Sequence, residues 1–245
     1  KPGTKGRDSV KVLEDTDGDG RADKITTFAD GLNIPTGVYP YRDGAIVWSI
    51  PNIWFLRDTD GDGRADRREK VYGPLGFERD THGMHSSFTR GFDCWLHVTH
   101  GFNNNTTVRG RDGSRIDLQS GNTYRIRPDG ARVEQFTWGQ VNPFGMHLDA
   151  RGYFYTADCH SSPLYQLIRG GYYPSFGKPH DGLGFAPTTI THTHGSTAIC
   201  GITRIDDPLW PAAFQGNILV GNVMTSRINR DTIDEHGSSP KGSEA

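Results

Sequence analysis

The chain has no long hydrophobic run, no excess of charge and few cysteines. No apolar stretch approaches the roughly 20 residues of a membrane-spanning helix, and a net charge of −2 gives no basic surface for nucleic acid or anionic membranes. Cys94, Cys159 and Cys200 allow at most one disulfide, and their spacing fits neither a CxxC zinc site nor a CxxCH haem attachment. We expect three buried thiols.

The composition also has little of what helical proteins are rich in. Hydrophobic residues make up 33% of the 245 residues, whereas Gly contributes 32 and Pro 14. Such a chain is rich in turns and poor in strong helix formers. A single all-β domain of this length is ordinary, and we expect short strands and many turns.

One nine-residue motif, DTDGDGRAD, occurs twice, as residues 15–23 and 58–66, with starts 43 residues apart. Its carboxylates at positions 1, 3 and 5 and its glycine at position 6 follow the ligand spacing of an EF-hand calcium loop. Four carboxylates within nine residues repel one another unless a cation neutralises them. The motif therefore predicts calcium, and an ordinary Asp/Gly turn is the alternative.

The motif is shorter than a complete EF-hand. Position 12 is Thr26 in the first copy and Glu69 in the second, so the fourth carboxylate is the aspartate at position 9. The flanking residues are β-rich, which favours a calcium-binding hairpin over a helix-loop-helix. The predicted ligands are the side chains of Asp15, Asp17, Asp19 and Asp23 with the Arg21 carbonyl, and those of Asp58, Asp60, Asp62 and Asp66 with the Arg64 carbonyl.

Strand-rich units of roughly 40–45 residues are typical of a β-propeller, in which each unit is one four-stranded blade. First strands can be aligned on the glycines at positions 37, 83, 145 and 201, whose spacings are 46, 62 and 56 residues. The longer spacings indicate insertions, at about 101–121 and 169–197. We expect residues 1–245 to form one partial propeller of the six-bladed type. It would hold half a blade, three further blades and the start of another, as part of a longer protein.

Several longer motifs resemble a known family. They are NPFG at 142–145, YTADCHS at 155–161, QLIRGGYYPSFGKPHDGLGF at 166–185 and HGSTAICG at 194–201. Together they resemble the amino-terminal propeller of large planctomycete proteins named membrane-bound dehydrogenases, and of relatives of these proteins. The resemblance covers nearly the whole chain.

The resemblance implies a function and its partners. In that family the propeller is similar to quinoprotein glucose and sorbosone dehydrogenases, which implies pyrroloquinoline quinone and a sugar or alcohol substrate. Helical repeats and a CxxCH cytochrome c domain typically follow, so haem is expected only in a downstream domain or a partner. A periplasmic or cell-envelope location is also implied.

Eight of the ten histidines lie at first-strand starts or in loops near second-strand ends. Strand alternation places such residues on one propeller face, opposite the calcium hairpins. We expect His85 or His147 to act as a base, oriented by Asp158. The candidate cofactor-binding residues are His82, His100, Arg169, Lys178, His194 and Arg204. The loop 169–187 is the candidate lid on that face.

Two alternatives stay open. His82 with His85, or His192 with His194, could ligate a transition metal, although HxxH outside a helix is a weak signal. The chain could instead be a non-catalytic, calcium-stabilised recognition or scaffold module. His97, on a predicted strand, is expected to be a packed interior residue.

Overall fold

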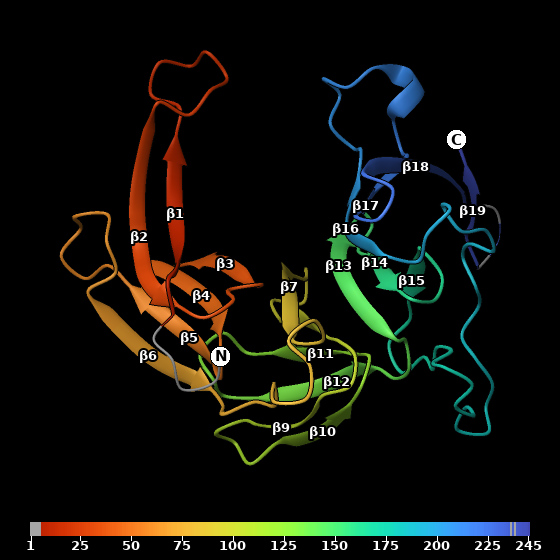
Figure 1. The fold of residues 1–245 in the computed structure, drawn as a ribbon, viewed down its shortest axis with the longest axis horizontal. Helices are drawn as coiled ribbons and strands as arrows, with labels where there is room; N and C mark the ends of the chain where they lie inside the picture. Colours follow the sequence, from red (N-terminus) through yellow and green to blue (C-terminus); the bar gives the residue numbers. More distant parts are fainter. Residues whose placement is uncertain (1–5, 236, 238) are drawn as a thin grey trace.

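The structure is a computed structural model that describes residues 6–235, 237 and 239–245. Its sheets follow one another along the chain as an open arc around a central space, with β1 and β2 at one end and β16–β19 at the other (Figure 1). Among the described residues the only helix is a 3-10 turn, Ala212–Phe214. The fold is all-β, and the arc of sheets is an incomplete propeller, as expected.

The strands fall into five sheets of the arc and one inserted hairpin. They are β1 (Asp8–Glu14) with β2 (Lys24–Leu32); β3 (Val38–Tyr41), β4 (Gly44–Ser49), β5 (Asn52–Arg57) and β6 (Arg67–Tyr72); β7 (His85–Arg90), β8 (Leu96–His100), β11 (Asn122–Ile126) and β12 (Val133–Thr137); the hairpin β9 (Asn105–Arg109) and β10 (Arg115–Gln119); β13 (Asn142–Leu148), β14 (Phe154–Cys159) and β15 (Tyr165–Leu167); and β16 (Ile199–Arg204), β17 (Ile218–Asn222), β18 (Arg227–Asp234) and β19 (Lys241–Glu244).

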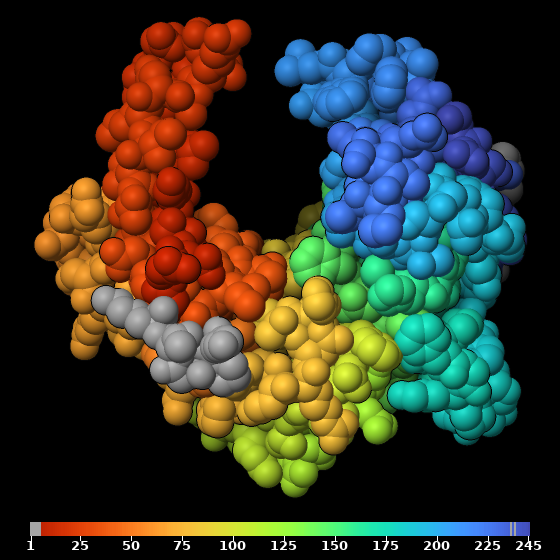
Figure 2. Space-filling model, in the orientation of Figure 1, coloured from red at the N-terminus to blue at the C-terminus, as the bar shows by residue number. Residues whose placement is uncertain are grey.

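The first strands of successive sheets lie side by side along the axis of the arc. A groove of about 290 Å³ runs over them and is lined by residues of β3, β7, β13 and β16 and their approaches. Glycine is required there because the backbones approach closely: a Cβ on Gly145, whose φ is 130°, would lie 2.8 Å from the Cα of Gly201. A Cβ on Gly37 would likewise lie 2.9 Å from the Phe88 ring. Gly201, in contrast, has open space around its Cβ position, and Gly83 lies before β7, against the backbone of Phe102. Figure 2 shows that the arc is hollowed on its open side.

The core lies between neighbouring sheets. One cluster joins β4 and β5 to β8 and β11 through fully buried side chains such as Trp48, Leu96 and Tyr124, and another joins β14 to β16 and β17. Each face of a middle strand therefore packs against a different neighbouring sheet, which is why β8 is buried along its whole length. This packing holds successive sheets in a fixed order.

Three expectations need correction. The polar insertion around 101–121 is a hairpin, β9–β10, because Val108 and Leu118 bury their side chains in the core. The last sheet is complete rather than begun, since β19 forms within the polar carboxyl-terminal residues. The cysteines are free but not buried: Cys94 is exposed on a turn, and the other two are partly exposed.

Candidate functional site

The sheet registers define two faces of the arc. We call the edge where β7 starts and β8 ends, with His85 paired to His100, the histidine face. The opposite edge, with the β3–β4 turn and the second DTDGDGRAD loop, is the aspartate face; the amide of Asp58 donates to the carbonyl of Asp43 there at 2.8 Å. The separation of histidines from aspartate loops agrees with strand alternation, except at His147.

His85 and His100 lie beneath the histidine face, sealed from solvent. His85 Nδ1 pairs with the Tyr124 hydroxyl at 2.7 Å, and His100 Nδ1 donates to the Ser120 carbonyl at 2.6 Å. The two rings are 5.0 Å apart, and Trp48 packs on His85. Burial lowers the pKa of His85 well below its ordinary value and that of His100 to about 4, so both are neutral. A substrate cannot reach His85, which contradicts its predicted role as a base.

Asp158 has a structural role. Its carboxylate accepts the backbone amides of Val141 and Asn142 and the Ser161 hydroxyl. Burial raises its pKa to about 7. These contacts fix the start of β13 beside the end of β14, and Asp158 does not orient His147 as we expected.

His147 lies near the aspartate face. It pairs with Tyr155, one residue pair before the end of the β13–β14 ladder. The charges of Asp206, Asp149 and Arg204 act on its imidazole. Partial burial lowers its pKa. The position overturns the expected grouping with His85, because β13 is long enough to carry residue 147 to the opposite edge.

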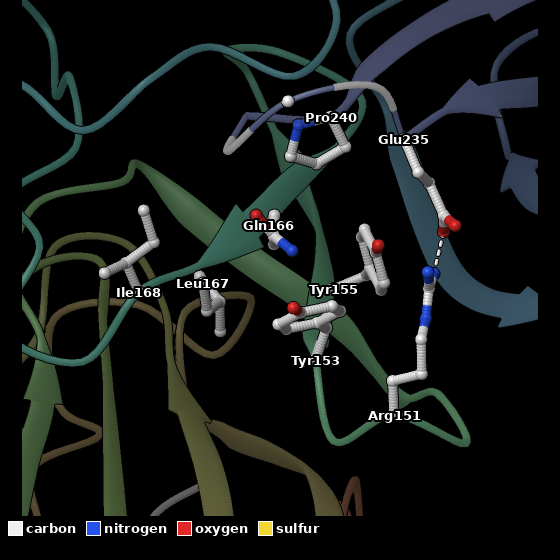
Figure 3. Close-up of a pocket in the computed structure, with 9 residues that line it drawn as sticks. Arg151, Tyr153, Tyr155, Gln166, Leu167, Ile168, Glu235 and Pro240 are labelled. Carbon is white, nitrogen blue, oxygen red and sulfur yellow. Dashed lines mark hydrogen bonds and ion pairs between the residues drawn. The ribbon is translucent and has the colours of Figure 1, made fainter.

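A cavity of about 390 Å³ lies on the aspartate face. Figure 3 shows the side chains that line it. Tyr153 and Tyr155 line it, together with Arg151, whose guanidinium is paired with Glu235. Glu235 also holds Arg204 at 2.6 Å. Both arginines are thus paired with a carboxylate, so the described residues that line this cavity offer no free cation to an anionic cofactor. Arg204, which we predicted to bind a cofactor, is engaged with Glu235 instead.

The exposed part of the histidine face carries a histidine–carboxylate pair. His82 Nδ1 lies 2.9 Å from Asp80 Oδ1, and the His82 side chain is 90% exposed. The carboxylate makes Nδ1 the donor, which leaves the Nε2 lone pair open to solvent. The buried side chain of Asn104 holds the loop by donating to the Asp80 and Gly83 carbonyls.

A polar cavity of about 190 Å³ lies on the same face, where Asn122 at the start of β11 pairs with His100. The buried Asn104 connects the cavity to the loop that carries His82, because its carbonyl accepts the amide of Ser120 beside the cavity. Trp138, 40% exposed, contributes an aromatic side chain. The other lining side chains that matter here are Asp117, Asn122, Gln135, Tyr172 and Lys178. Sequence reasoning singled out only Lys178 in this set.

The loop 169–187 reaches the histidine face. Its Phe176 ring lies 5.5 Å from Phe102 and 6.4 Å from His160, both of which follow second strands. Arg169, at the start of the loop, is instead paired with Glu134 at 3.1 Å. The loop therefore covers part of the predicted face, but its arginine is held elsewhere.

The two DTDGDGRAD loops have the same geometry. In each, the first three aspartates can bring one carboxylate oxygen apiece within 4.8 Å of one another. Asp15 accepts the amides of Gly18 and Gly20 at 2.7 and 2.8 Å, and these bonds lower its pKa. In the second loop Asp58 does the same with Gly61 and Gly63.

The aspartates at position 9 are placed differently. Asp23 and Asp66 accept hydrogen bonds from the amide and hydroxyl of Thr16 and Thr59, and so close the loops. The amides of Arg21 and Arg64 donate to Asp19 and Asp62. The late carboxylate Glu69 is paired with Arg57 at 3.2 Å.

His194 belongs to a separate cluster. Its Nε2 lies 2.9 Å from one oxygen of Asp231, and the Nε2 of His192 lies 2.9 Å from the other. The predicted cofactor-binding residues are thus dispersed: His82 and Lys178 lie on the histidine face, His100 is buried, and Arg169, His194 and Arg204 are each engaged with carboxylates elsewhere.

Similarity to solved structures is limited to low sequence identity. An oxidoreductase of Thermus thermophilus, described as a glucose dehydrogenase, is 13% identical with a TM-score of 0.47, over 88% of this chain and 84% of that one. The PQQ-bound aldose sugar dehydrogenase of Streptomyces coelicolor is 13% identical with a TM-score of 0.43, over 97% and 86%. The apo form of an Escherichia coli aldose sugar dehydrogenase is 11% identical with a TM-score of 0.43, over 87% and 86%.

No curated protein matches the chain. Within the described residues no helix is long and apolar enough to cross a membrane. A family match, in contrast, extends over residues 1–245. The chain belongs to the DUF7133 family, which is described as a domain of unknown function.

Proposed function

We propose that this chain is the substrate-binding propeller of a quinoprotein-type sugar or alcohol dehydrogenase, and that its histidine face receives the substrate hydroxyl. The observation that carries the proposal is the pair formed by His82 and Asp80. An imidazole oriented by a carboxylate, with its other nitrogen free, is suited to accept a hydroxyl proton.

The polar cavity on the same face supports a polyhydroxylated ligand. An aromatic face such as that of Trp138 packs against the C–H face of a sugar ring, while carboxylate and amide groups hydrogen-bond to its hydroxyls. At about 190 Å³ the cavity is smaller than the roughly 300–1,000 Å³ of drug-sized sites, so its size suits a monosaccharide.

The residues of this chain fit the quinone cofactor less well than they fit the substrate. Pyrroloquinoline quinone carries carboxylates, and the cations predicted to hold it do not meet: Arg169 and Arg204 are ion-paired, and only Lys178 lines the cavity. We therefore assign hydroxyl binding and proton abstraction to this chain. The oxidation also requires a two-electron acceptor, which the proposal takes to be a quinone that passes electrons to a cytochrome c domain or partner.

We propose that calcium binds to the DTDGDGRAD loops as a structural ion. Three carboxylates grouped in each DTDGDGRAD loop, with amides already bound to the first aspartate, support one Ca²⁺ per loop. Calcium modules with dissociation constants of roughly 10⁻⁴–10⁻³ M operate outside the cytoplasm. The proposal takes from the sequence motifs a periplasmic or cell-envelope location and membership of the planctomycete dehydrogenase family.

A second candidate is a non-catalytic, calcium-stabilised recognition or scaffold module. It is favoured by the structural roles of His85, His100 and Asp158, which leave fewer groups for chemistry than expected.

The test uses the intact protein with calcium and added pyrroloquinoline quinone, and measures dye-linked oxidation of a panel of sugars and alcohols. Turnover of at least one sugar, with KM raised about tenfold or more by Trp138→Ala, is expected. Trp210→Ala, at a similarly exposed tryptophan outside the cavity, is the control. Sugar binding without turnover would support the recognition module, and neither binding nor turnover would contradict the dehydrogenase and a module that recognises sugars.

A further inference from the structure

A buried cluster of two histidines and one aspartate lies outside the histidine-face site. The Nε2 atoms of His192 and His194 lie 2.9 Å from Oδ1 and Oδ2 of Asp231, respectively. The imidazole rings are 4.8 Å apart at 75°. One ligand atom from each residue can be chosen so that all three lie within 4.8 Å of one another.

The fold holds these three side chains in place. Asp231 lies in β18, between Ile218 of β17 and Glu244 of β19. The segment before β16 carries both histidines, and Asn222 fixes it by donating to the His194 carbonyl at 3.2 Å. Asp231 and the His194 side chain are fully buried, whereas the His192 side chain is 26% exposed. Burial thus holds Asp231 and His194 in place, and solvent can reach the cluster at His192.

The distances fit a cation. In a tetrahedral site with bonds of about 2.0–2.2 Å, ligand atoms are separated by roughly 3.4 Å. With one Asp231 oxygen as the ligand, one nitrogen–oxygen distance is 2.9 Å, about half an ångström short of this separation, and the other distances within the set are at most 4.8 Å. Two imidazole nitrogens and a carboxylate suit Zn²⁺ and neighbouring transition metals, unlike the all-oxygen DTDGDGRAD loops, which suit calcium.

A nearby carboxylate can accept a hydrogen bond from His194 when its Nε2 binds a metal. Without metal, each Nε2–H donates to one Asp231 oxygen. With Nε2 bound to a metal, the proton of His194 must reside on Nδ1, an atom that has no hydrogen-bond partner within the described part of the chain. The nearest acceptor is Glu244 Oε1, 3.5 Å away. A carboxylate beside the second nitrogen of a ligand histidine orients such ligands in metal sites.

We propose that His192, His194 and Asp231 bind one divalent transition-metal ion of the Zn²⁺ class. Glu244 orients His194 as a positioning residue, and solvent reaches the ion past His192. The site does not depend on the proposed dehydrogenase function, since it shares no residue with His82, Asp80 or the polar cavity.

The test is a Zn²⁺ titration of the metal-free intact protein against a chromophoric chelator, with calcium in excess to occupy the all-oxygen sites. The wild type should bind one equivalent with a dissociation constant of micromolar or below. His192→Ala and Asp231→Asn should each weaken binding at least tenfold. His180→Ala, at an exposed histidine outside the cluster, should leave it unchanged.

A second measurement guards against misfolding. Co²⁺ bound by nitrogen and oxygen in a four-coordinate site gives visible absorption, which should appear in the wild type and vanish in His192→Ala, the variant at the partly exposed ligand. Should Asp231→Asn fail to fold, His192→Ala decides alone. Absence of one-equivalent binding by the wild type, or binding that survives His192→Ala, would overturn the proposal.

Discussion

The two faces of the arc use their polar side chains differently. On the aspartate face, Arg151 and Arg204 are paired with Glu235, and the first three aspartates of each DTDGDGRAD loop lie close enough together to share a cation. On the histidine face, His85 is sealed beneath the surface while His82, three residues earlier, stays open to solvent. Polar groups with structural partners stabilise the fold, so His82, whose Nε2 stays open to solvent, is the one to test for chemistry.

The largest expected effect is on the aspartate face, where removal of calcium should destabilise the protein. Without the ion, three carboxylates in each loop repel one another at close range. With two sites each occupied at free calcium about 100 times the dissociation constant, excess chelator should lower the melting temperature by on the order of 10 °C. Differential scanning calorimetry measures this.

The matched control for the chelation experiment is Asp58→Asn with Asp60→Asn. These substitutions should abolish about half of the calcium-dependent shift while leaving the first loop intact. A melting temperature that chelator does not change, with no calcium found by elemental analysis, would show that the DTDGDGRAD loops are ordinary turns.

The next effect lies under the histidine face. His85→Ala removes a fully buried ring that contacts Trp48 and leaves the Tyr124 hydroxyl without its partner. Loss of a buried ring typically costs about 3–5 kcal/mol in the free energy of unfolding. Urea denaturation should detect this, with Tyr124→Phe as the milder comparison because it removes only the hydrogen bond. A change below about 1 kcal/mol would contradict a structural role for His85.

Acidification should act on the same interior. Burial lowers the pKa of His97 and of His100 to about 4, so the unfolded state takes up protons first as pH falls below about 6.5. Each histidine then costs about 1.4 kcal/mol of stability per pH unit until the folded pKa is reached. Asp158, with its pKa raised to about 7, binds its proton more tightly when folded and so offsets part of the loss.

Counting His85 as well, whose pKa burial lowers further, three histidines cost about 4 kcal/mol between pH 7.5 and pH 5.5 and Asp158 offsets about 2 of it. The net expectation is a loss of about 2 kcal/mol, measured by urea denaturation. His97→Phe should reduce the pH dependence, since the ring lies among aromatic side chains, 4.7 Å from Phe136 and 4.1 Å from Phe154. Stability that is independent of pH over this range would mean that these imidazoles are accessible to protons in the folded state.

The fold could be predicted from local patterns, whereas much of the site could not. Strand alternation and the repeated DTDGDGRAD hairpin depend on neighbouring residues, and these predictions hold in the structure. The role of a polar residue depends on partners distant in sequence: Glu235 neutralises Arg151, which is 84 residues away. Likewise, β7 begins at His85 and excludes His82, so two histidines of one HxxH motif have different surroundings.

The smallest expected effect on stability, and the sharpest test of the difference between the two histidines, is His82→Ala. Its side chain is 90% exposed, so the free energy of unfolding should change by less than about 0.5 kcal/mol. If His82 accepts the hydroxyl proton, the rate of sugar or alcohol oxidation should nevertheless fall about 10²- to 10⁴-fold. Asp80→Asn should reduce the rate less, because Nε2 survives while its orienting carboxylate is lost. If the wild type oxidises a sugar or alcohol and His82→Ala does so at an unchanged rate, His82 does not accept the hydroxyl proton.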